Sequence, residues 1–122
     1  MPAEKAVVLI VEDEPIVRFN TLDVLEDVGH KVLEAANADE AMYHLRHRKD
    51  IDVVFTDVNM GGSMDGIQLA QRVRALRPHT GIIITSGVVR LDPMLLPANT
   101  VFLPKPYRHD MLLSAIHRLV AA

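Results

Sequence analysis

The feature that most constrains the fold is an alternation between short apolar runs and longer stretches with helical spacing. Four runs are rich in β-branched or aromatic side chains and are too short for a helix: residues 7–11, 53–55, 82–84 and 101–103. A weaker fifth candidate is residues 31–35, whose charged ends suggest a position nearer the edge of a sheet. These runs predict five strands, most of them buried.

The stretches between the runs carry apolar side chains at helical intervals. They predict helices over residues 17–28, 38–45 and 67–73, and a last helix over 111–120. Strands that alternate with helices favour a parallel sheet covered on both faces and joined by right-handed crossovers, which is a doubly wound α/β fold. Pro93 and Pro97 leave room for only a short or irregular fourth helix between Gly87 and Asn99.

Composition limits the classes of function. The 122 residues fit one domain, so we expect a single domain over 1–122 with no output domain. Thirteen Lys and Arg against sixteen Asp and Glu give a net charge of -3, which argues against direct nucleic-acid binding. The chain has no cysteine and no apolar stretch long enough for a membrane span or a signal-peptide core. A cytoplasmic protein without a membrane partner is the expectation.

Polar side chains follow four of the predicted strands, at the edge where parallel α/β sheets bind ligands. They are Glu12, Asp13, Asp57, Ser86, and Lys105 followed by Pro106. Carboxylates a few ångströms apart repel by roughly 4 kcal/mol per pair at an effective dielectric near 20, so three of them call for a cation. Oxygen ligands favour Mg²⁺, with Mn²⁺ as a second possibility. A cation, an ammonium and a hydroxyl around Asp57 are the groups needed to receive a phosphoryl group.

Five motifs occur in order along nearly the whole chain: Val-Glu-Asp-Glu-Pro at 11–15, Phe-Thr-Asp-Val-Asn-Met at 55–60, Met-Asp-Gly at 64–66, Thr-Ser-Gly at 85–87 and Leu-Pro-Lys-Pro-Tyr at 103–107. Together they resemble a receiver domain of two-component response regulators. The resemblance implies a flavodoxin-like sheet with strand order 2-1-3-4-5. It also implies a phosphoryl donor, either a sensor histidine kinase or a phosphotransfer protein, and a downstream protein target that the sequence does not name.

The same resemblance implies a role for each matching residue. Asp57 is then the phosphoacceptor, and Mg²⁺ is held by Glu12, Asp13, Asp57 and the backbone carbonyl of Asn59. Ser86 is the switch hydroxyl, Lys105 binds the phosphoryl group, and Phe102 takes the place of the aromatic switch residue. The resemblance further implies a cis peptide bond between Lys105 and Pro106, which only X-Pro bonds adopt at modest cost.

The chain departs from the family pattern at two places. The loop after Asp57 contains Gly61 and Gly62 and has an extra residue before Met64, which predicts a more mobile loop. The interval between Ser86 and Lys105 is shorter than usual, and the loss falls in the fourth helix. We therefore expect the contact face that many relatives build around that helix to differ here.

Several functions compete for these residues. The leading one is a stand-alone receiver that signals through protein contacts or acts as a phosphate shuttle or sink, with only self-directed phosphorylation and autophosphatase chemistry. A receiver cut from a larger regulator or a hybrid kinase is the alternative. A phosphohydrolase of the haloacid dehalogenase type is disfavoured because Asn59 stands where a second acid is needed. A nucleotide-binding module is disfavoured because acidic residues at 12–14 replace a glycine-rich phosphate loop.

Overall fold

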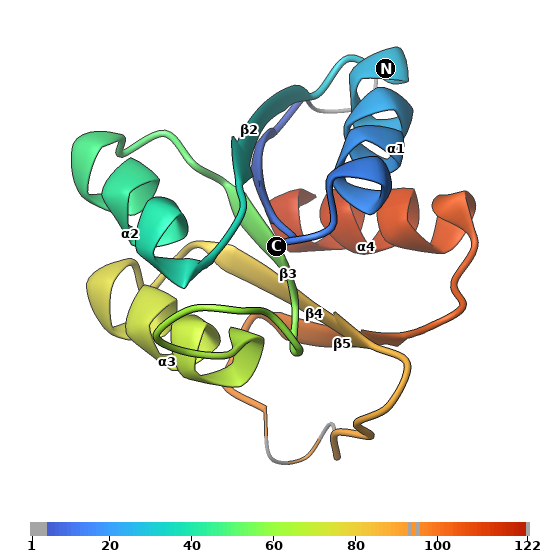
Figure 1. Ribbon diagram of the computed structural model, residues 1–122. Coiled ribbons are helices and arrows are strands. Elements are labelled where there is room, and N and C mark those ends of the chain that lie inside the picture. Colours follow the sequence, from blue (N-terminus) through green and yellow to red (C-terminus); the bar gives the residue numbers. More distant parts are fainter. Residues whose placement is uncertain (1–4, 93, 95, 122) are drawn as a thin grey trace.

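A computed structural model describes residues 5–92, 94 and 96–121 of the chain. Its centre is one five-stranded sheet in the order β2-β1-β3-β4-β5 (Figure 1). The strands are β1 (Val7–Val11), β2 (Lys31–Ala35), β3 (Val53–Asp57), β4 (Gly81–Ser86) and β5 (Thr100–Pro104). All four neighbouring pairs run parallel. The flavodoxin-like α/β fold and its strand order are therefore confirmed, with the weakest predicted strand, β2, at one edge.

In the described part of the chain, four α-helices cover the two faces of the sheet. They are α1 (Pro15–Asp27), α2 (Ala38–His47), α3 (Gly66–Leu76) and α4 (His109–Ala121). Helices α2 and α3 lie on one face, and α1 and α4 lie on the other (Figure 1). Successive side chains of a strand point to opposite faces, so β4 sends Ile82 and Ile84 into the first core and Ile83 into the second. Both faces of the central strands are thus buried, which accounts for their continuous apolar runs.

The helix ends follow local sequence signals. Pro15 occupies the first turn of α1, and the Asn37 side chain accepts a hydrogen bond of 2.9 Å from the Glu40 amide at the start of α2. The start of α3 has a full capping box, in which Asp65 and Gln68 each bond the other's backbone N–H. The Asp-x-x-Gln spacing at residues 65–68 is a signal for this cap in the sequence itself.

The connection between β4 and β5 is irregular, as predicted. Its described residues contain no α-helix, and Met94 has 3₁₀ geometry. Leu95, within the short helix expected around residues 94–96, lies outside the described part. Val89, Leu91 and Leu96 pack against the core on the α3 side. The shortened interval and its prolines leave too few residues for a regular helix on the β4–β5 side of the sheet.

None of the described helices is long and apolar enough to cross a membrane.

Candidate functional site

Two carboxylates and one ammonium group meet at the carboxyl ends of three parallel strands. Glu12 follows β1, Asp57 ends β3 and Lys105 follows β5. The Lys105 Nζ donates a hydrogen bond of 2.7 Å to Asp57 Oδ2 and lies 4.0 Å from Glu12 Oε1. Asp57 is 9% exposed and Glu12 is 7% exposed, so Lys105 supplies the positive charge for two largely buried carboxylates.

The pKa values of this group reflect the crowding of charge. Burial raises the pKa of Glu12 to about 7, and its contacts with Asp13 and Asp57 act in the same direction. Burial alone lowers the pKa of Lys105, but the hydrogen bond and negative charge of Asp57, together with Glu12, outweigh it and leave that pKa raised. Lys105 therefore stays charged while Glu12 titrates near neutral pH.

Asp13 and Asn59 occupy the rim of the site. Asp13 is exposed, and its Oδ2 accepts a hydrogen bond of 3.3 Å from the Gly61 amide. The backbone N–H of Asn59 donates a hydrogen bond of 3.3 Å to Asp57 Oδ1. Within residues 5–92, 94 and 96–121, no three Asp, Glu, His or Cys side chains gather closely enough to hold a metal ion. Lys105 bridges the carboxylates of Glu12 and Asp57, while the Asp13 carboxylate contacts the Glu12 side chain and reaches the Gly61 amide.

The Ser86 side chain accepts hydrogen bonds from the turn that follows β4. Ser86 is 2% exposed, and its Oγ accepts hydrogen bonds from the amides of Val88 at 3.2 Å and Val89 at 2.9 Å. The Lys105 amide donates to the Ser86 carbonyl at 3.0 Å. Ser86 and Lys105 are therefore joined through the backbone, and the Ser86 hydroxyl proton stays available for an acceptor.

The residues around Lys105 fix the end of β5. The peptide bond between Lys105 and Pro106 is cis. Phe102 is half-buried and packs against the core on the α2–α3 face. Tyr107 packs edge-to-face against Phe55 at 5.9 Å between ring centroids, on the opposite face. Aromatic rings close to Lys105 in the sequence thus lie on both faces of the sheet.

Gly66 has a packing role that the sequence motif alone did not predict. A Cβ at this position would lie 2.1 Å from the carbonyl oxygen of Asp57, so no larger residue fits without a shift of the backbone. The Gly66 amide also donates to the Val58 carbonyl at 2.9 Å. Gly66 therefore lets the start of α3 pack directly on the peptide of Asp57, which the Met-Asp-Gly motif signals only through the glycine itself.

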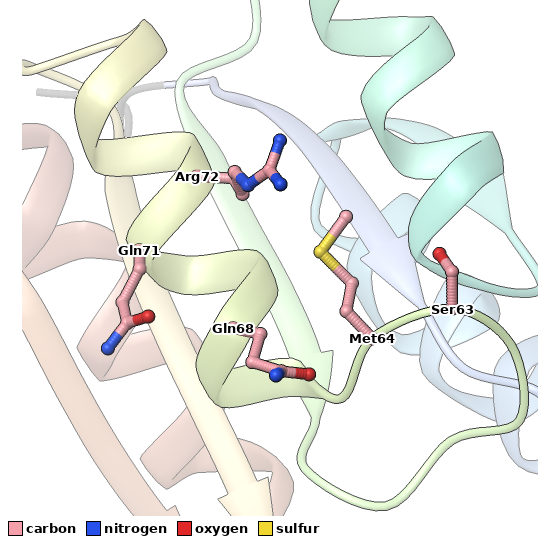
Figure 2. Close-up of a pocket in the computed structure, with 5 residues that line it drawn as sticks. All are labelled: Ser63, Met64, Gln68, Gln71 and Arg72. Atoms are coloured by element: carbon pink, nitrogen blue, oxygen red, sulfur yellow. The ribbon is translucent and has the colours of Figure 1, made fainter.

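The strand-end residues do not surround a large pocket. The void lined by Glu12, Asp57 and Lys105 measures about 10 Å³, which has room for about one water molecule and cannot enclose an organic substrate. A larger groove of about 390 Å³ lies along α3 and the loop before it (Figure 2). It is lined by Ser63, Met64, Gln68, Gln71 and Arg72, and none of the strand-end site residues contributes to it.

Comparisons with known proteins agree with this geometry. The family described as response regulator receiver domain matches residues 8–117. The sensor kinase CckA of Brucella abortus is 34% identical over 120 residues, and the match covers 94% of this chain and 12% of that protein. The regulatory protein NtrX of Azorhizobium caulinodans is 27% identical, with 91% of this chain and 25% of that protein covered. The chain thus spans a quarter or less of these two relatives.

A solved structure is similar over its whole length. The crystal structure of a response regulator receiver protein from Sinorhizobium medicae is 28% identical with a TM-score of 0.88, and the match covers 98% of this chain and 97% of that one. The fold, the strand-end residues and the family match all lead to the same assignment. The chain belongs to the response regulator receiver domain family of two-component signalling.

Proposed function

We propose that Asp57 accepts a phosphoryl group from a phosphohistidine, which belongs to a sensor histidine kinase or to a phosphotransfer protein. The observation that carries this proposal is the 2.7 Å contact between Lys105 Nζ and Asp57 Oδ2 at the carboxyl edge of a receiver-type sheet. A carboxylate held beside an ammonium is suited to receive a dianionic phosphoryl group, since phosphoryl transfer depends on positioning and neutralisation of charge. The open edge is also suited to a donor that is itself a protein.

The proposed step exchanges one bond for another. A carboxylate oxygen of Asp57 attacks phosphorus in line, a P–O bond forms, and the P–N bond to the donor imidazole breaks. The electron pair of that bond returns to the imidazole nitrogen, which takes a proton from solvent. Lys105 binds one phosphoryl oxygen, and the Ser86 hydroxyl donates to another as the chain's own contributions to charge neutralisation.

The acidic residues of the site suit a hard divalent cation. Burial and the neighbouring carboxylates raise the pKa of Glu12 to about 7, so the ionised site lacks positive charge. Glu12, Asp13, Asp57 and the Asn59 carbonyl would hold Mg²⁺, or Mn²⁺ in its place. Mg²⁺ keeps several waters and uses one or two carboxylates directly, so the three acids need not touch it together. When bound, the ion supplies further positive charge for the phosphoryl oxygens.

The phosphorylated state is proposed to act through protein contacts. A phosphoryl group on Asp57 adds charge and hydrogen-bond acceptors, and we expect the Ser86 hydroxyl and the Phe102 ring to respond to it. The protein partner then reads the changed surface near β5. Signalling as a separate protein, service as a phosphate shuttle or sink, and service as one domain of a longer regulator or hybrid kinase all use this same step.

Transfer from an autophosphorylated histidine kinase with labelled phosphate tests the proposal. We expect label to leave the kinase and appear on this chain in a linkage that hydroxylamine cleaves, as an acyl phosphate requires. The Asp57→Asn variant should remain unlabelled, whereas Asp52→Asn, at the other end of β3, should accept label normally. Equal labelling of the Asp57→Asn variant would overturn the assignment of the phosphoacceptor.

A further inference from the structure

Arg18 on α1 holds the backbone between the two acids that follow β1. Its side chain is only 14% exposed. The Nη1 atom donates a hydrogen bond of 2.7 Å to the carbonyl oxygen of Glu12, and Nε donates one of 3.1 Å to Glu34 Oε1 near the end of β2. One guanidinium therefore links α1, the β1–α1 loop and β2.

The carbonyl that Arg18 holds belongs to the peptide bond between Glu12 and Asp13. Because a peptide unit is planar, fixing this oxygen also fixes the amide of Asp13 and the direction in which its Cα leaves. The Glu12 amide is held separately, by a hydrogen bond of 3.0 Å to the Ala35 carbonyl. The backbone at the two acids is thus bound on both sides by groups outside the β1–α1 loop.

Two cations lie near this edge, and they bond to different kinds of group. Lys105 contacts the carboxylates of Asp57 and Glu12 directly. Arg18 instead bonds a main-chain carbonyl, and Glu34 balances its charge. Arg18 therefore does not pair with the carboxylate of Asp13, which contacts the Glu12 side chain and accepts a hydrogen bond of 3.3 Å from the Gly61 amide. Arg18 fixes the backbone of the acids without occupying their oxygens.

The two contacts need the shape of arginine. Nη1 and Nε point from one rigid plane toward acceptors on different elements, the Glu12 carbonyl and the Glu34 carboxylate. A lysine keeps the positive charge but has one nitrogen on a flexible stem, so it cannot reproduce the planar fork. Arg18→Lys therefore separates the geometric role of this residue from its charge.

We infer that Arg18, oriented by Glu34, is a positioning residue for the cation that Glu12 and Asp13 would bind, an inference that rests on the proposed function. By fixing the Glu12–Asp13 peptide, Arg18 keeps both carboxylates at the edge before the ion arrives. Residues that orient metal ligands commonly change affinity by about 10- to 100-fold when they are replaced. Arg18→Lys and Arg18→Gln should therefore weaken divalent-ion binding by about tenfold or more.

The test is a Mn²⁺ titration of the unphosphorylated protein, followed by electron paramagnetic resonance of the free ion. The variants are Arg18→Lys, Arg18→Gln, Glu34→Gln and Asp13→Asn. The control is Arg72→Gln, which replaces an exposed arginine on α3 beside the groove of Figure 2. Thermal unfolding of each variant is measured alongside, and all titrations are made well below the lowest transition.

Weaker Mn²⁺ binding in both Arg18 variants, with wild-type affinity in Arg72→Gln, supports the inference. A merely structural role would lower the unfolding temperature and leave the dissociation constant of the folded protein unchanged, and that result overturns it. If an Arg18 variant does not fold, the Glu34→Gln variant provides the test. Unchanged Mn²⁺ affinity in Glu34→Gln rejects a positioning role for Arg18 and Glu34. Absence of Mn²⁺ binding by the wild type, or wild-type binding by Asp13→Asn, instead overturns the proposed cation site on which this inference rests.

Discussion

Lys105 Nζ and Asp57 Oδ2 lie 2.7 Å apart, although 48 residues separate them in the chain. The contact exists because β3 and β5 both pair in parallel with β4, so their carboxyl ends reach the same edge of the sheet. The same ammonium lies 4.0 Å from Glu12 Oε1, which places one cation between the acids of two strands. The parallel pairing of the strands therefore brings the residues of the site together.

Removing the ammonium tests its place in the transfer step. Lys105→Ala should slow phosphorylation of Asp57 by about 100-fold, the usual effect of removing one group that stabilises developing charge. The measurement is the rate of acyl phosphate formation from a fixed donor concentration. Lys49→Ala removes an exposed lysine after α2 and should keep the wild-type rate. A wild-type rate in Lys105→Ala contradicts a direct role for Lys105 at the phosphoryl group.

Glu12 makes the stability of the protein depend on pH. Its pKa rises from 4.5 to about 7 on folding, so the folded state favours the protonated acid. The stability that this preference contributes is full below pH 4.5 and is lost as pH rises toward about 7. Glu12→Gln, which mimics the protonated acid, should unfold with a free energy about 2 kcal/mol higher than wild type above neutral pH. The difference should disappear in acid.

Urea unfolding across that pH range, without divalent ions, measures the Glu12 effect. The exposed Glu26→Gln on α1 is the matched control and should stay within about 0.5 kcal/mol of wild type. A stability difference for Glu12→Gln that does not change with pH argues against the raised pKa.

Gly66 should tolerate no side chain. A Cβ there would lie 2.1 Å from the Asp57 carbonyl oxygen, so Gly66→Ala should lower the free energy of unfolding by about 1–3 kcal/mol and slow phosphorylation as the Asp57 peptide moves. Gly61→Ala is the control, since no atom outside Gly61 and its two chain neighbours lies within 4 Å of the Cβ position. Chemical denaturation with intact-mass analysis checks both effects, and equal stability of the two variants rejects the close approach.

His30 should destabilise the protein in acid. Its Nδ1 accepts a hydrogen bond of 3.0 Å from the Ala6 amide, and burial followed by the charge of Lys5 lowers the pKa of His30. The folded state therefore favours the neutral ring, whose contribution is full above pH 6.5 and is lost as pH falls through the lower folded pKa. Protonation removes the acceptor, which should cost about 1 kcal/mol.

An NMR titration of the His30 ring checks the direction of this shift. Its midpoint should fall below 6.5, and His30→Phe should remove the corresponding acid-induced loss of stability. The exposed His79→Phe serves as the control variant. A His30 midpoint at or above 6.5 contradicts the lowering of this pKa by burial and by the charge of Lys5.

The strands and the edge site were predictable because both follow from periodicity and topology. Short β-branched runs such as Ile82–Ile84 are buried on both faces, and residues after parallel strands meet at one edge. The contacts that orient the site were less visible. In the sequence, Arg18 has no feature that distinguishes it from other arginines on helices. Its hydrogen bond to the Glu12 carbonyl depends on the angle at which α1 leaves the sheet. The irregular β4–β5 connection followed from its prolines, but its path depends on packing against α3.

Intact mass after incubation with phosphoramidate, a small donor with a P–N bond, tests the central claim most directly. The protein is treated with Mg²⁺, with excess chelator, and as the Asp57→Asn variant with Mg²⁺. We predict a gain of one phosphoryl group on the wild type with Mg²⁺, a much smaller gain with chelator, and none on Asp57→Asn. A wild-type protein that gains no phosphoryl group, or an Asp57→Asn variant that gains one equally, would contradict the account.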